Sequence, residues 1–186
     1  MISTPIRFSK QLIILALVAF SLQSCVGVRS GGSSGKISKY VEEFFVGDNV
    51  FQYFVKPLKY DTDNQVDAFV DATLRNKDKT TDSLTVNFTV SLKTLDEIEQ
   101  LVIKNSTDVV KISTIKTFFR EPAEEEGFYD HRGSIQLPYS QYVDFLLNEN
   151  HSIEIKTASE RISIRPSKKA LKAMNAVKNK FAVRIN

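Results

Sequence analysis

Few side chains in this sequence have the type and spacing that catalysis or metal binding requires. The 186 residues include two histidines, His131 and His151, and a single cysteine, Cys25. A zinc site needs three or four clustered ligands, and this set does not supply them. Asp130 precedes His131, but neighbouring residues of a strand point to opposite faces, which argues against an acid–base pair. We therefore expect no catalytic residue, no metal site and no cofactor.

Three motifs match parts of known functional patterns without the context that those patterns need. Ser33 lies in a G-x-S-x-G, which in hydrolases requires a strand before it and a helix after it. The segment 61–64 begins like a calcium loop, yet Val66 and Ala72 occupy the Gly and Glu positions of the EF-hand pattern. The acidic run 121–127 could collect Ca²⁺ through its carboxylates, although such runs are more often solvated loops.

The first 25 residues carry the most specific signal. Arg7 and Lys10 precede an apolar run over 12–22, which is too short to span a membrane and is typical of a secretory signal peptide. The run ends in Leu22-Gln23-Ser24-Cys25. In this segment the chain resembles bacterial lipoproteins, whose lipobox has Leu three residues before an invariant Cys. The resemblance implies cleavage before Cys25 and its acylation. An ordinary signal peptide is the alternative.

These features predict three segments. Residues 1–24 are a cleaved signal peptide, 25–36 are a lipidated cysteine with a Gly/Ser-rich tether, and 37–186 are a single globular domain. Two or more acyl chains would hold Cys25 stably on a bilayer. By resemblance to lipoprotein sorting, the lack of Asp after Cys25 favours the outer over the inner membrane. The mature chain would have a net charge of +1, which argues against a nucleic-acid partner.

Alternating apolar and polar residues dominate the domain and predict antiparallel strands with one buried face. The fold class expected is α+β and rich in β: a sheet or sandwich of about eight strands, one short internal helix and a C-terminal amphipathic helix. A helical turn is expected over 37–44, the internal helix over 140–147, and the last helix after an N-cap at Ser167. The expected strands cover 51–60, 66–74, 84–92, 99–104, 109–119, 128–137 and a hairpin that pairs 153–155 with 162–164.

Positive charge is concentrated at the C-terminus. From Arg161 onward there are eight basic side chains and no acidic one, whereas residues 25–160 have a net charge of −7. Basic amphipathic helices bind anionic membranes or acidic partners, and the alternative is a helix whose lysines face water. The lysines of the last helix, which we expect to contact a partner, are Lys168, Lys169, Lys172, Lys178 and Lys180.

The function expected from these features is that of a non-catalytic binding or assembly module of the cell envelope. Its partners would be the bilayer, through acylated Cys25, and an envelope protein complex or an anionic surface. Two alternatives stay open. An envelope hydrolase acting on carbohydrate or cell-wall material needs a pocket with two carboxylates, and 22 acidic residues single out no pair. A carrier of a small apolar ligand needs a large apolar cavity.

Overall fold

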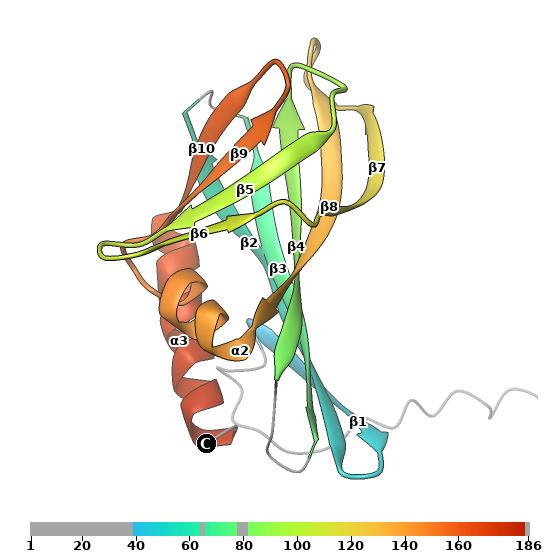
Figure 1. Cartoon of the computed structure of the whole chain (residues 1–186). Coiled ribbons are helices and arrows are strands. Elements are labelled where there is room, and N and C mark those ends of the chain that lie inside the picture. The colour runs from blue at the N-terminus through green and yellow to red at the C-terminus, as the bar shows by residue number, and fades with distance from the viewer. Residues whose placement is uncertain (1–38, 64–65, 78–81, 185–186) are drawn as a thin grey trace, which may run out of the picture. The chain divides into compact units, whose positions relative to one another are not determined.

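The computed structural model describes residues 39–63, 66–77 and 82–184. These residues form one ten-stranded sheet with two helical segments, an α+β fold rich in β structure, as the sequence predicts (Figure 1). The strands are β1 (Val41–Gly47), β2 (Val50–Thr62), β3 (Ala68–Lys77), β4 (Ser83–Leu92), β5 (Ile98–Lys104), β6 (Val109–Ile112), β7 (Lys116–Pro122), β8 (Tyr129–Pro138), β9 (Ser152–Thr157) and β10 (Arg161–Pro166). The helical segments are α2 (Tyr139–Gln141), which continues as the π-helix η1 (Tyr142–Leu146), and α3 (Lys168–Arg184).

The long strand β2 organises the sheet. It pairs with β3 on one side, whereas its other side pairs first with β1 and then with β10. All pairs are antiparallel, and the strand order is β6-β5-β9-β10-β2-β3-β4-β8-β7, with β1 beside β2. The sheet bends over itself, so that β5 crosses in front of β3 and β4 (Figure 1).

The core lies between the two halves of this bent sheet. Alternate residues of β3 and β4, such as Val70 and Phe88, are buried, and they meet Leu101 of β5 and Ile155 of β9 around one small internal cavity. The alternation that predicts these strands is therefore confirmed as burial on one face. Helix α3 packs Met174, Val177 and other apolar residues against this core.

Several expected elements are confirmed. The hairpin pairs Ile162 with Ile155 and Ile164 with Ile153. The Ser167 hydroxyl oxygen accepts the backbone N–H of Ala170 at 3.2 Å, as an N-cap should.

Two expectations need correction. The helical turn over 37–44 is wrong for its described part, because Val41 begins β1 and pairs with Val55 of β2, and long-range pairing overrides the helical spacing. The single strand over 109–119 is two strands, β6 and β7, which pair with different neighbours. The expected internal helix is present over residues 139–146, as one short turn of α-helix that widens into a π-helix.

Some sequence predictions concern segments outside the described residues. These are the signal peptide over 1–24, the lipidation of Cys25, and the tether with its G-x-S-x-G. Within the described ranges, no helix is both long enough and apolar enough to cross a bilayer.

Candidate functional site: a groove at the open seam of the sheet

The two ends of the sheet are consecutive in sequence, and they leave a gap between them. Among the described residues, β6 pairs only with β5 and β7 pairs only with β8, and residues 113–115 join β6 to β7. β7 begins opposite Ser134, so the last part of β8, residues 135–138, pairs with β4 but has no strand on its other side among the described residues. The sheet therefore approaches closure as a barrel and stops short of it.

A groove of about 530 Å³ lies at this gap, and we call it the seam groove. It is lined by Val110, Lys111, Ile112, Ser113, Thr114, Ile115, Lys116, Ser134, Ile135, Gln136, Leu137 and Gln141. The position of this lining matters for binding. The groove runs between two strand edges, β6 and 135–138, whose backbone groups on this side lack a partner strand in the described part of the chain.

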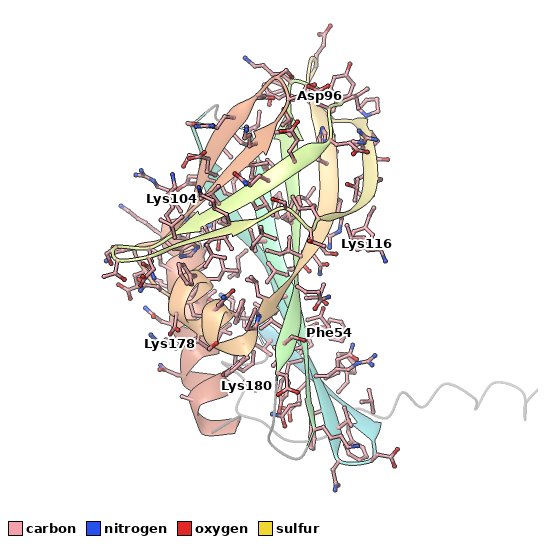
Figure 2. All side chains as sticks on the ribbon, in the orientation of Figure 1. Phe54, Asp96, Lys104, Lys116, Lys178 and Lys180 are labelled. Atoms are coloured by element: carbon pink, nitrogen blue, oxygen red, sulfur yellow. The ribbon has the colours of Figure 1, made fainter. Side chains whose placement is uncertain are left out.

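Charge in the seam groove has a single sign. Its lining includes Lys111 and Lys116 and contains no aspartate or glutamate. Both lysines are exposed, and the Lys116 ammonium lies 5.3 Å from the centre of the Phe118 ring (Figure 2). Apolar side chains such as Ile112, Ile115 and Leu137 form much of the remaining wall. The groove can accept an extended chain that forms backbone hydrogen bonds with the strand edges and apolar contacts with the wall. Acidic side chains of that chain can pair with the two lysines.

The five lysines that the sequence singles out on the last helix do not form one surface. Lys168, Lys169, Lys172 and Lys178 are exposed, and none of them has an ion pair among the described residues. We call these four the helix lysine face. Lys180 is instead buried: its ammonium lies 3.0 Å from Glu43 Oε2 and 5.6 Å from the centre of the Tyr53 ring (Figure 2). Lys180 is therefore not part of the exposed surface, because it lies on the side of α3 that faces β1 and β2.

Both histidines are buried structural residues. His131 Nε2 lies 2.7 Å from the carbonyl oxygen of Thr94. His151 Nδ1 lies 2.6 Å from the carbonyl oxygen of Asn148, so Nδ1 donates there and Nε2 accepts the Tyr60 hydroxyl at 3.0 Å. Burial lowers the pKa of both histidines and raises the pKa of Tyr60 well above its usual value. These hydrogen bonds occupy both ring nitrogens of His151 and the Nε2 nitrogen of His131.

The acidic run 121–127 covers the end of β7 and the exposed turn that follows it, beside a groove of about 420 Å³. Four carboxylates line that groove: Asp67, Glu124, Glu125 and Asp130. Asp67 forms an ion pair with Lys59, and Asp130 accepts the Ser91 hydroxyl at 2.6 Å. In the described part of the chain, no three His, Cys, Asp or Glu residues are grouped so that they could hold a metal ion. The groove is one place among the described residues where a hydrolase with two carboxylates could act.

Two small cavities lie among the described core residues. Each has a volume of about 10 Å³, and one of them is lined only by apolar side chains such as Phe88 and Ile155. A space of that size is close to that of a single water molecule. Neither of these two cavities has room for the apolar ligand that a carrier would bind.

Sequence reasoning missed the seam groove. Residues 109–119 contain no Gly or Pro to mark the break between β6 and β7, and the pairing of each strand is set by distant segments. The one available signal is Ser113-Thr114, a polar pair inside an apolar segment.

Comparison with known proteins finds no matching protein family, no matching curated protein and no matching solved structure.

Proposed function

We propose that this protein is a lipid-anchored, non-catalytic binding module of the cell envelope that binds an extended segment of a partner protein in the seam groove. The lipobox that ends at Cys25 supports the anchor. The observation that carries the binding site is the pair of strand edges, β6 and residues 135–138, on either side of one groove. Unpaired strand edges are templates for another chain, and peptide recognition by strand addition uses them.

The lining of the seam groove defines the kind of segment that it would bind. Lys111 and Lys116 favour acidic side chains, and the apolar wall favours residues that alternate with them. Main-chain hydrogen bonds would supply affinity that depends little on sequence, and the two lysines would supply selectivity. A tethered module also searches a thin layer above the membrane, which raises its effective concentration for a neighbouring envelope protein.

The helix lysine face is a second candidate contact surface. Its four exposed lysines carry no compensating ion pair in the described part of the chain, so they are available to an acidic partner or an anionic surface. The seam groove and the helix lysine face predict different sensitive residues, so that one experiment can separate them.

We would compare two double charge reversals that change the net charge equally. Lys111→Glu with Lys116→Glu alters the seam groove, and Lys168→Glu with Lys172→Glu alters the helix lysine face. Partner recovery after mild crosslinking in intact cells should fall for the groove variant alone. With the purified partner added, amide hydrogen exchange should slow over 109–112 and 135–138. Loss of recovery for the helix variant alone would move the contact to α3, and unchanged recovery for both would overturn both sites.

The anchor is tested separately. Cys25→Ser removes the acylated thiol, so the precursor should stay unprocessed by the lipoprotein route or release soluble protein. Cell fractionation would measure this, and a variant that stays membrane-bound like the wild type would contradict the lipid anchor.

A further inference from the structure

The end of the β1–β2 hairpin exposes an unusual amount of apolar surface. Phe44, Phe45, Val46 and Phe51, which we call the hairpin tip, are 46%, 59%, 54% and 36% exposed. The strands are joined by Asp48 and Asn49, both at positive φ, which gives a tight two-residue turn. In Figure 1 this hairpin lies at the opposite end of the sheet from the turn between β9 and β10. Large apolar side chains gathered on one exposed element mark an interaction site.

Aromatic rings lie on both faces of the ribbon. Phe45 and Phe51 are cross-strand neighbours on one face, with ring centres 5.3 Å apart. Phe44 and Phe54 lie on the other face, with ring centres 5.5 Å apart. The surface of a folded partner would cover one face of such a ribbon. The interfacial layer of a bilayer is fluid and surrounds a narrow element on several sides, so it suits this arrangement better.

Cationic side chains accompany the rings. Arg75 and Lys77 of β3 lie opposite Gln52 and Val50 of β2, and Arg75 Nε donates a hydrogen bond to Gln52 Oε1 at 2.8 Å. Cross-strand neighbours share a face of the sheet, so these cations lie on the same face as Phe44. Aromatic residues combined with Lys and Arg are typical of segments that lie in a membrane interface with anionic lipids.

Chain length places the hairpin tip within reach of the anchored membrane. This step rests on the proposed lipid anchor. Sixteen residues lead from Cys25 to Val41, where β1 begins, and a fully extended chain of that length spans at most about 55 Å. The hairpin tip can therefore reach the bilayer that holds the anchor.

We propose that the hairpin tip is a second membrane contact, which lies in the headgroup layer of the bilayer that holds acylated Cys25. The contact is shallow, because Asp48 at the turn keeps a charged carboxylate among the headgroups. With two points of attachment the domain would hold a preferred orientation above the membrane. Otherwise it would rotate freely on its tether.

The absence of tryptophan from the chain allows a direct test. Phe45→Trp places a single fluorophore in the hairpin tip, and Phe118→Trp in β7 is the matched control, since Phe118 is also exposed. Each mature lipidated variant is reconstituted in vesicles of phosphatidylethanolamine and phosphatidylglycerol, with and without brominated acyl chains. We expect a blue-shifted emission and a loss of intensity from brominated lipid for Phe45→Trp and neither change for Phe118→Trp. Phe44→Trp is a second probe on the other face, in case Phe45→Trp does not fold.

The outcomes separate this inference from the proposed anchor. If the protein floats with the vesicles but bromine quenches neither hairpin probe, the tip contact is overturned and the anchor stands. If no lipidated form of the protein can be recovered and the protein does not float with the vesicles, the anchor is overturned. This inference is then overturned with it. A blue shift that grows with protein density and resists bromine would instead identify a second copy of the chain as the occupant, which also overturns the inference.

Discussion

The ammonium nitrogen of Lys180 lies 3.0 Å from a carboxylate oxygen of Glu43, and this ion pair joins the C-terminal helix to the first strand. The Lys180 side chain is 5% exposed and the Glu43 side chain 21% exposed. Breaking a fully buried pair costs about 3–5 kcal/mol, because the remaining charge is left without compensation. Glu43 keeps some contact with water, so we expect a smaller cost here.

Lys180→Met should lower the free energy of unfolding by about 1–3 kcal/mol, because it leaves the Glu43 carboxylate without its cation. The matched control is Lys178→Met, an exposed lysine of the same helix, which should change stability by less than about 0.5 kcal/mol. Adding Glu43→Gln to Lys180→Met should recover part of the loss. Urea unfolding of the four proteins measures these differences. Equal stability of the two lysine variants would show that the ion pair contributes nothing.

Lys180 also illustrates what a helical pattern can predict. The sequence shows a run of lysines that all look suited to a solvent-facing surface, and the structure confirms exposure for Lys168, Lys169, Lys172 and Lys178. Lys180 differs only because Glu43 and Tyr53 lie beside its position on α3. Those residues belong to strands more than 120 positions earlier in the chain, and a local pattern contains no information about them.

The fold could be predicted where a strand is half buried along its whole length. In β4 the residues from Leu84 to Val90 alternate strictly between buried and partly exposed, so one period-two pattern defines both the strand and its inner face. The same pattern did not identify β1. Phe44, Phe45 and Val46 are consecutive apolar residues, so they do not alternate with polar ones, and the structure leaves all three exposed. The seam groove also depends on long-range pairing. It exists because the pairing of β7 with β8 starts at Ser134 and leaves residues 135–138 without β7 beside them, and no local pattern encodes that register.

Gly133 is required by a close approach inside the sheet. A Cβ atom at this position would lie 2.7 Å from Cζ of Phe88 and 3.1 Å from the carbonyl oxygen of Lys116. Gly133→Ala should therefore destabilise the domain by about 1–3 kcal/mol, the usual cost of overpacking a buried position.

Phe88→Leu removes the ring atoms that the new methyl group would meet, so the double variant should lose less stability than the sum of the two single changes. Thermal unfolding of the set measures this coupling. Additive losses would show that Phe88 is not the obstacle.

The buried histidines should make stability depend on pH. Burial lowers the pKa of His131 and of His151 in the folded state, whereas the unfolded chain titrates near 6.5. As the pH falls below about 6.5 the unfolded chain takes up protons that the folded chain does not, so the free energy of unfolding decreases. Stability should therefore be constant above about pH 7 and decline toward pH 5.

A separate decline belongs to the carboxylates. Hydrogen bonds from Ser159 and Lys104 lower the pKa of Asp96 and of Glu154, respectively, so their contributions are lost only below about pH 4.5. The urea midpoint, followed from about pH 8 down to about pH 2, measures both effects. His151→Gln should reduce the slope between pH 7 and pH 5 whatever its effect on absolute stability, and an unchanged slope would contradict the assignment to His151.

Asp71 and Arg132 form the centre of a polar network on the outer face of the sheet, and it should act as a unit. Arg132 Nη2 lies 2.9 Å from Asp71 Oδ2, Arg132 Nη1 donates to Thr89 Oγ1 at 2.7 Å, and Asn87 Nδ2 donates to Asp71 Oδ1 at 2.6 Å. The Asp71 side chain is only 12% exposed, so removing Arg132 leaves a mostly buried carboxylate with one donor. Arg132→Met should therefore cost about 1–3 kcal/mol, and Asp71→Asn should cost less when Arg132 is already absent. A double-mutant cycle in urea measures the coupling, and a value near zero would mean that solvent already satisfies both side chains.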